Sequence, residues 1–454
     1  MNHWEPSSWT KKTAKQQPHY DDQDHFESVL QTLATRPPLV TSWEIERLKQ
    51  QIALAAEGKA FLLQGGDCSE SFADCCPDPI ERKLKLLLQM SVVLIHGLRM
   101  PVIRIGRIAG QYAKPRSSDT QTKDDVTLPS YRGDIVNRCD FTPADRKNRP
   151  ELMLQAYDCS SATLNYLRAL TDGGFADLHH PDLWELDFVS KSIRSEQYHQ
   201  MVRNIDNSLR FIDSIGGTMP QDLSTVDFYT SHEALLLPYE QAFTRRAISL
   251  GGWYNLGTHL PWIGDRTREI DGAHVEYFRG INNPIGVKIG PTATPNDVKQ
   301  LLETLDPNRE PGRMTLICRY GAKKIEQGLP PIIEAVKQTG HPVLWSVDPM
   351  HGNTTTTDDG IKTRHFDDIL SEGRMSFEIH KSHGTFVGGV HLELTGKNVT
   401  ECVGGAGGPK SSELSRAYES NVDPRLNYDQ AMEIAFLIAD EVRRQNSDGA
   451  PSLA

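Results

Sequence analysis

Short apolar runs alternate with longer amphipathic stretches along most of the chain. Each run ends in polar or glycine-rich residues, and the stretch that follows it has the helical period of about 3.6 residues. Strands that alternate with helices pair in parallel, and eight such units can close into a barrel. We therefore predict an α/β fold, a (β/α)8 TIM barrel. Its strands are expected at residues 60–64, 102–106, 226–231, 254–263, 285–289, 314–318, 343–347 and 389–394.

Both ends of the chain carry helical patterns outside this alternation. Residues 42–56 have a helical period ahead of the first run, so we predict an N-terminal extension at 1–58 and a catalytic barrel at 59–454. Near the other end, Asn427 and Gln430 have the spacing of a capping box, which predicts the start of a last helix.

The interval between the second and third runs is too long for one connecting helix. We therefore predict a helical insertion between strands 2 and 3, at about residues 118–223, with helices at 149–170 and 188–215. Long insertions on compact domains are usually functional or interaction elements, so we expect one of these roles here.

The composition is that of an ordinary globular protein, with 38% apolar and 24% charged residues in 454. The net charge of −11 argues against a general nucleic-acid binder, which needs an excess of basic surface. The most apolar stretch, residues 84–98, is interrupted by polar side chains, so we predict no membrane segment. Seven irregularly spaced cysteines do not form the framework of a secreted protein, and we predict a cytoplasmic one.

Reactive side chains gather directly after the predicted strands. In a barrel, these positions converge on one face, which is where catalysis takes place. They hold Gly65-Gly66-Asp67-Cys68, residues 107–117, His232-Glu233, Asp265-Arg266, Lys288, Arg319, residues 348–351 and Glu393. Turns alone would need only small neutral residues, so this set of basic, acidic, thiol and imidazole groups predicts an active site.

Basic residues from four predicted strands are expected to face one cavity. They are Arg107, Lys114, Arg116, Arg266, Lys288 and Arg319. An acidic protein tolerates such crowding where bound anions offset it, and arginine and lysine suit phosphate and carboxylate. Residues 114–117 form one group and the other positions form a second. Two phosphorylated substrates, or one bisphosphate, would satisfy both groups, and the alternative is a solvated basic surface.

A mixed set of donors also falls at this face. Cys68, His351, Glu393 and Asp423 offer a thiolate, an imidazole and two carboxylates. Such donors suit a divalent transition metal rather than Mg²⁺ or Ca²⁺, which prefer oxygen. The spacing is not that of a compact motif, so a structural thiol and a hydrogen-bonded histidine remain alternatives at this point.

Several long segments resemble the signatures of the type II, plant-like 3-deoxy-D-arabino-heptulosonate 7-phosphate (DAHP) synthases, and they run in that family's order over nearly the whole chain. They are 64–72 (QGGDCSESF), 107–117 (RIAGQYAKPRS), 131–134 (YRGD), 231–235 (SHEAL), 262–268 (WIGDRTR), 271–274 (DGAH), 283–288 (NPIGVK), 348–354 (DPMHGNT), 362–364 (KTR), 398–402 (NVTEC) and 423–427 (DPRLN). The resemblance implies a metal-dependent condensation of phosphoenolpyruvate with erythrose 4-phosphate, the first step of the shikimate pathway.

Carried over position by position, the resemblance implies a role for each candidate. The metal ligands would be Cys68, His351, Glu393 and Asp423. Phosphoenolpyruvate would be bound by Arg107, Asp265, Arg266, Lys288 and Arg319. The phosphate of erythrose 4-phosphate would be bound by Lys114, Pro115, Arg116 and Ser117. Lys288, His351 and Cys68 would be the catalytic residues, and Mn²⁺ or Co²⁺ the metal, with Zn²⁺, Fe²⁺ and Cd²⁺ as further candidates.

Two positions depart from the family pattern. Relatives often carry Glu where this chain has Asp265, and the shorter side chain is expected to shift a bound water. Relatives often carry Cys where this chain has Val422, so redox pairing of Cys68 with that neighbour is excluded here.

The resemblance also implies a homo-oligomer, a dimer or a tetramer, with aromatic amino acids as effectors and no nucleic-acid or membrane partner. Three other functions compete with this one. A sister synthase that joins phosphoenolpyruvate to another aldose phosphate is disfavoured by the long type II motifs. A metal-dependent hydrolase would need several histidine ligands, and only His351 is a credible one. A non-catalytic regulatory barrel should have lost metal ligands, yet all four candidates are present.

Overall fold

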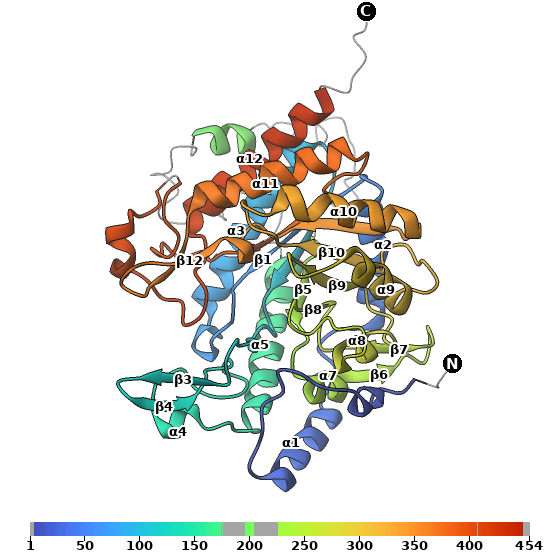
Figure 1. The fold of residues 1–454 in the computed structure, drawn as a ribbon, viewed down its shortest axis with the longest axis vertical. Helices are drawn as coiled ribbons and strands as arrows, with labels where there is room; N and C mark the ends of the chain where they lie inside the picture. Colours follow the sequence, from blue (N-terminus) through green and yellow to red (C-terminus); the bar gives the residue numbers. More distant parts are fainter. Residues whose placement is uncertain (1–3, 174, 176–195, 204–225, 406, 448–454) are drawn as a thin grey trace, which may run out of the picture.

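Eight parallel strands close into a barrel at the centre of the molecule (Figure 1). The computed structural model describes residues 4–173, 175, 196–203, 226–405 and 407–447. Around the barrel, the strands follow the order β1-β14-β11-β10-β9-β8-β5-β2, so each strand pairs with its neighbours in the chain. The strands are β1 (Phe61–Gly66), β2 (Val102–Arg107), β5 (Tyr229–Glu233), β8 (Leu260–Ile263), β9 (Ile285–Ile289), β10 (Met314–Cys318), β11 (Val343–Val347) and β14 (Gly389–Glu393). The predicted α/β barrel is confirmed.

The strand bounds agree best where the apolar runs are shortest. The predictions for β9, β10 and β11 match residue for residue, whereas β5 begins three positions after the predicted start at residue 226. The prediction of a single strand at 254–263 is wrong. Its first part belongs to β7 (Trp253–Asn255), which pairs antiparallel with β6 (Thr244–Arg246) outside the barrel.

A buried side-chain amide explains that break. Asn283 donates its Nδ2 protons to the carbonyl oxygens of Asn255 (2.9 Å) and Thr258 (3.2 Å). These carbonyls therefore accept from a side chain rather than from a neighbouring strand, and the chain turns before it enters the barrel at Leu260. Apolar content alone does not reveal such a turn.

Helices cover the outer face of the barrel, and the strands are buried on both faces as parallel strands usually are. The helices on this face include α3 (Pro77–Leu98), α7 (Leu237–Phe243), α8 (Ala273–Phe278), α9 (Pro295–Leu305), α10 (Ile325–Thr339), α11 (Phe366–Ser382) and α12 (Tyr428–Ser447). Helix α2 (Ser42–Ala56) instead packs against residues of β1, β2, β5, β8 and β11 at one end of the barrel. The capping box ahead of α12 is present, because Asn427 and Gln430 each accept a backbone proton from the other. Helices α3 and α12 approach closely at Gly97, where a Cβ atom would lie 2.3 Å from that of Ala439.

The chain between β2 and β5 begins with an element that the sequence did not predict. An exposed hairpin, β3 (Thr120–Lys123) and β4 (Val126–Pro129), precedes α4 (Pro143–Arg146) and α5 (Leu152–Asp172). Helix α5 lies close to the predicted 149–170. The helix predicted at 188–215 lies largely outside the described residues, of which 196–203 are helical.

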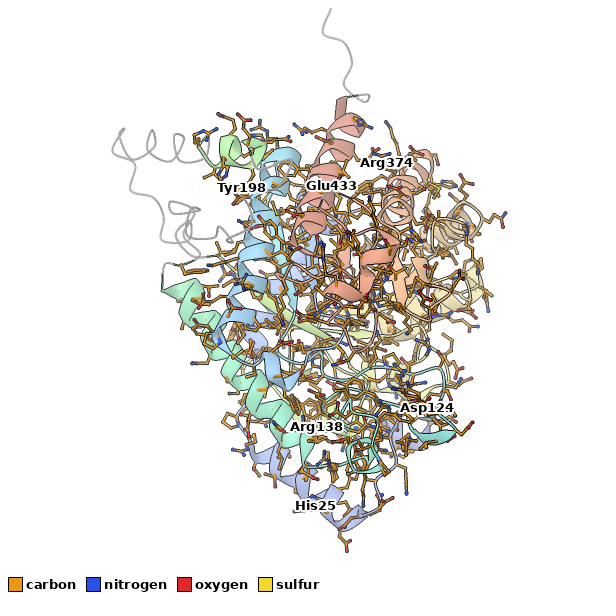
Figure 2. The ribbon with its side chains drawn as sticks, turned by 90° about the vertical axis from the view of Figure 1, so that its left-hand side faces the viewer. His25, Asp124, Arg138, Tyr198, Arg374 and Glu433 are labelled. Carbon is orange, nitrogen blue, oxygen red and sulfur yellow. The ribbon has the colours of Figure 1, made fainter. Side chains whose placement is uncertain are left out.

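The N-terminal region and this hairpin lie at the same end of the molecule. Figure 2 shows His25 of α1 (Gln23–Thr35) and Asp124 of the β3–β4 turn at the end opposite Glu433 of α12. Ahead of α1, the chain runs across the barrel, where Trp4 donates to the carbonyl of Glu276 and Trp9 to the side chain of Gln241. Within the described residues, no helix combines the length and apolar composition that a membrane crossing needs.

Candidate active site

A polar cavity of about 320 Å³ opens at the carboxyl ends of the barrel strands. It is lined by Cys68, Arg107, Gln111, Lys114, Pro115, Glu233, Trp262, Gly264, Asp265, Arg266, Lys288, Arg319, His351, Thr354, Lys362 and Asp423. The candidates for phosphoenolpyruvate, metal and aldose phosphate that line it come from strand ends or the loops that follow them. Asp423 lies late in the loop after β14, shortly before α12.

Three of the four predicted metal ligands converge. Cys68 follows β1, Glu393 ends β14, and Asp423 lies in the loop before α12; their donor atoms all lie within 4.8 Å of one another. The Cys68 Sγ to Asp423 Oδ2 distance is 3.6 Å. His351, the fourth, joins the group through Glu393, because its Nε2 lies 2.9 Å from Glu393 Oε1.

A buried carboxylate orients the imidazole of His351. Asp348 Oδ2 lies 2.7 Å from His351 Nδ1, and Asp348 Oδ1 accepts the backbone protons of Met350 and His351. Nδ1 is thereby occupied and Nε2 faces Glu393, the arrangement that metal-binding histidines usually have. Burial alone would raise the pKa of Asp348, but His351 and Lys288 lower it well below its usual range.

Two lysine ammonium groups contact the sulfur and oxygen atoms of the predicted metal ligands. Lys114 Nζ lies 2.6 Å from both Cys68 Sγ and Asp423 Oδ2, and Lys362 Nζ lies 3.0 Å from Asp423 Oδ1. Burial alone would lower the pKa of Lys114, but Asp423 and Cys68 raise it. Burial also raises the pKa of the Cys68 thiol, so a metal must displace that proton on binding.

These observations fit a divalent transition metal. The cluster offers one sulfur, one imidazole nitrogen and two carboxylates, Asp348 orients its imidazole, and ammonium groups lie against its donor atoms. The structure places Lys114, predicted at a substrate phosphate, between the ligands and residues 115–117.

Arg107 is held in one position by several partners. Its Nε donates to Asp67 O (3.0 Å), its Nη2 to Glu393 Oε1 (2.9 Å), and its Nη1 to the ring nitrogen Nε2 of His391 (2.6 Å). The guanidinium carbon also lies 5.3 Å from the centre of the Trp262 ring. With this side chain only 2% exposed, its direction is set by the barrel interior.

The remaining residues predicted to bind phosphoenolpyruvate lie around the same cavity. Arg319 donates to Asp265 Oδ2 (3.1 Å) and to the carbonyl of His351 (2.9 Å). Lys288 forms an ion pair with Asp348, and burial lowers its pKa to about 8. Asp348 therefore links Lys288 to His351, which joins the predicted substrate residues to the predicted metal ligands.

The two predicted substrate groups meet at one contact. Arg266 Nη2 donates to Ser117 Oγ at 3.0 Å, although the first was assigned to phosphoenolpyruvate and the second to erythrose 4-phosphate. Both side chains are exposed, whereas Arg116 is half-buried and Lys114 is buried. The residues of the predicted aldose-phosphate group thus extend from the metal cluster to the rim of the cavity.

A buried carboxylate shapes the start of the loop that carries this group. Glu70 accepts backbone protons from Ala109 (3.0 Å), Gly110 (2.9 Å) and Gln111 (2.8 Å). Ala109 has a φ of +60°, a conformation that few non-glycine residues adopt. Three successive amides aimed at one carboxylate hold this turn, and the turn directs the following residues over the cavity.

Several residues of the site have no role in the prediction from sequence. Glu233 and Trp262 line the cavity, and Arg364 lies 2.7 Å from Glu393 Oε2. Glu233 is half-buried, the burial of its carboxyl group raises its pKa, and its Oε1 has no hydrogen-bond partner in the described part of the chain. Its place directly after a predicted strand was a usable signal, whereas Arg364 is marked only by the KTR segment at 362–364 that resembles the family.

Comparisons with known proteins agree with the geometry. Residues 4–439 match the family described as the Class-II DAHP synthetase family. A phospho-2-dehydro-3-deoxyheptonate aldolase of Streptomyces coelicolor is 49% identical over 439 residues, covering 97% of both chains. A protein of that name from Neurospora crassa is 49% identical over 461 residues, covering 98% of this chain and 95% of its own. A third, from Mycolicibacterium smegmatis, is 47% identical over 437 residues, covering 95% and 93%.

Proposed function

The chain belongs to the class-II DAHP synthetase family, and we propose that it condenses phosphoenolpyruvate with erythrose 4-phosphate in the cavity at the mouth of its barrel. It is an enzyme of the transferase class that forms DAHP and phosphate, the first step of the shikimate pathway. The observation that carries the proposed site is the convergence of Cys68, Glu393 and Asp423 beside His351, with basic groups on the same cavity.

The cavity residues divide into three roles under this proposal. Cys68, His351, Glu393 and Asp423 hold the metal, which when bound supplies Lewis-acid polarisation of the aldehyde oxygen. Arg107, Asp265, Arg266, Lys288 and Arg319 bind phosphoenolpyruvate. Lys114, Pro115, Arg116 and Ser117 bind the phosphate of erythrose 4-phosphate.

Substrate alignment follows from how these groups are fixed. The methylene carbon of phosphoenolpyruvate forms a bond to the aldehyde carbon, water adds at C2, and phosphate leaves by C–O cleavage. Arg107 and Arg319 are each held by several hydrogen bonds, so they present a pre-formed grip that reduces the entropy cost of bringing two substrates together. Lys288 Nζ, buried at the reacting centre, donates to the developing negative charge.

A phosphate-release assay tests the activity. The purified enzyme, loaded with metal, is supplied with phosphoenolpyruvate and either erythrose 4-phosphate or arabinose 5-phosphate. Phosphate release only with the four-carbon sugar supports the proposal. Release with the five-carbon sugar would instead identify the sister octulosonate 8-phosphate activity, and release with neither sugar would favour a non-catalytic barrel.

We propose Mn²⁺ or Co²⁺ as the metal, with Zn²⁺, Fe²⁺ and Cd²⁺ as further candidates, because the donors include a thiolate and an imidazole. A chelator should abolish activity, and Mn²⁺ or Co²⁺ should restore it. Full activity in metal-free buffer would contradict a metal-dependent mechanism. We also propose a cytoplasmic location, because all seven cysteines are free thiols.

Regulation is a second part of the proposal. We propose an N-terminal extension at 1–58 and a barrel at 59–454 with an insertion at about 118–223, in a homo-oligomer, a dimer or a tetramer, inhibited by Trp, Phe or Tyr. An effector can act only by binding one conformational state better than another. Deleting residues 188–215 should leave catalysis largely intact and abolish inhibition. An intact enzyme whose rate ignores all three amino acids, alone and mixed, would contradict this proposal.

A further inference from the structure

Two neighbouring glutamines ahead of α1 reach two different loops of the active site. Gln16 uses both ends of its amide on one residue: its Oε1 accepts from Arg116 N (2.8 Å), and its Nε2 donates to Arg116 O (3.0 Å). Gln17 contacts the chain after β5 in the same manner, donating to Leu235 O (2.7 Å) and accepting from Leu237 N (3.2 Å). Each amide therefore pairs with the backbone as a strand neighbour would.

The backbone at Gln16 is in an uncommon conformation. Its φ is +63°, in the left-handed region that non-glycine residues rarely occupy, and such a conformation persists only where the surroundings enforce it. With the backbone in this conformation, the Gln16 side chain forms its two hydrogen bonds to Arg116. The Oε1 atom also lies 3.4 Å from Arg132 Nη1, which adds a charged donor on the same side.

The segment that carries Gln16 is anchored to the barrel independently of the loop it holds. Upstream, Ala273 N donates to Thr13 O at 3.0 Å, and Lys15 forms an ion pair with Glu269. Downstream, Asn148 Nδ2 donates to His19 O at 2.9 Å. Gln16 is thus a fixed point rather than a part of the loop after β2.

The loop has few other restraints at this position. Lys114 N donates to Arg132 O, and the next residue, Pro115, has no backbone proton to donate. Within the described part of the chain, the backbone of Arg116 forms hydrogen bonds with Gln16 alone. Arg116 is half-buried and Ser117 is exposed, so packing restrains the tip of the loop less than it restrains Lys114.

We propose that Gln16 is a positioning residue for the aldose-phosphate subsite, acting through the backbone of Arg116 to aim the Arg116 and Ser117 side chains at the substrate phosphate. The inference rests on the proposed function, which assigns residues 114–117 to that phosphate. It extends the functional site into a polar segment outside the barrel. Gln16 does not touch substrate, so its loss should misplace the loop without removing any reacting group.

Kinetics on the full-length enzyme test the inference. Replacing Gln16 with Ala should raise KM for erythrose 4-phosphate about tenfold, as expected for the loss of one to two net hydrogen bonds, and leave KM for phosphoenolpyruvate within about twofold. The matched control is Lys11→Ala, because Lys11 is exposed in the same N-terminal segment and its side chain forms no ion pair or hydrogen bond with another described residue. Its two KM values should equal those of the unmodified enzyme.

A second pair of variants separates this inference from the function it rests on. Arg116→Ala removes the proposed phosphate contact itself and should raise KM for erythrose 4-phosphate. In that background, the further change Gln16→Ala should raise KM by much less than in the unmodified enzyme, because the side chain that Gln16 aims is already gone. A purely structural role for Gln16 would instead give the same increase in KM in both backgrounds.

The outcomes are distinct. If Arg116→Ala leaves KM for erythrose 4-phosphate unchanged, the subsite assignment is wrong. If Arg116→Ala raises that KM and Gln16→Ala does not, the subsite stands and the role of Gln16 is overturned. A Gln16→Ala enzyme with both KM values raised, or with a lowered thermal midpoint and a lower kcat, would show a general structural role and also overturn the inference.

Discussion

The inner and outer halves of the cavity are built in different ways. In the inner half, Arg107, Asp348 and Glu393 are at most 2% exposed, and each contacts several other charged or polar groups from neighbouring strand ends. In the outer half, Ser117 and Arg266 are exposed and meet at a single hydrogen bond. The loop after β2, which carries Ser117, is held by Gln16 from outside the barrel. A change in the inner half should therefore disturb metal, substrate and stability together, whereas a change in the outer half should alter one substrate.

The largest effect is expected at Glu393, where the inner half is most interconnected. Its carboxylate faces Arg107, Arg364 and His351, and replacing it with Ala leaves two buried guanidinium groups uncompensated. We expect a loss of about 3–5 kcal/mol in the free energy of unfolding, together with loss of metal and activity. Urea unfolding and metal analysis after dialysis measure both.

Glu378, exposed on α11, supplies the matched control. Replacing it with Ala should change the free energy of unfolding by less than about 0.5 kcal/mol and leave the kinetics as they are. If the two variants unfold at the same urea concentration, the inner half is less interdependent than its contacts indicate.

The next effect is expected at Asp348, which contacts the metal site only through His351. Asn in its place would turn an amide toward Lys288 and His351 Nδ1, so the imidazole would lose the acceptor that orients it. We expect metal affinity to fall by about 10–100-fold, measured by calorimetric titration of the metal-free protein with Mn²⁺. The exposed Asp367 serves as the control for the same substitution, and equal affinities in the two variants would remove Asp348 from the site.

The pH dependence of phosphoenolpyruvate binding should reveal Lys288. Burial lowers its pKa from 10.5 to about 8, so the ammonium group is present at pH 7 and is lost as the pH rises through 8. Binding that needs the charge should weaken by up to about tenfold per pH unit above 8. Calorimetry with phosphoenolpyruvate at pH 7 and 9 measures the change.

A variant that cannot titrate isolates this effect. In Lys288→Arg, the guanidinium stays charged across that range, so any binding that remains should lose most of its pH dependence. Unchanged affinity of the unmodified enzyme between pH 7 and 9 would show that the ammonium charge of Lys288 does not hold the substrate.

The contrast between the inner and outer halves also explains how much of the molecule could be predicted from the sequence. The strands β9, β10 and β11 were found residue for residue because both faces are buried, which makes them short apolar runs with polar ends. The metal and phosphoenolpyruvate candidates follow such runs, so the barrel topology alone brings them together. Inner-half residues are marked by their place in the fold.

Features of the outer half do not follow short apolar runs, so the sequence pattern does not indicate them. The hairpin β3–β4 is exposed along nearly its whole length, so it has no buried face and no alternation of apolar and polar residues to reveal it. Gln16 lies in an irregular polar segment, and its role depends on a φ of +63° and on a loop one hundred residues away in the chain. Contacts between irregular segments leave no periodic trace in either partner.

The smallest effect is expected at the tip of this hairpin, and it tests where the outer half ends. Asp124 and Asp125 form the two-residue turn with φ values of +48° and +61°, the conformation in which Asp-Gly is a preferred pair. Asp125→Gly should therefore raise the free energy of unfolding by less than about 1 kcal/mol. Both KM values should stay unchanged, since neither strand of the hairpin lines the cavity.

The hairpin nevertheless adjoins the outer half, because Asp119 at its base forms an ion pair with Arg132, which lies beside Gln16. A shift in one KM value alone would extend the outer half into the hairpin, and a shift in both KM values would contradict the division of the cavity.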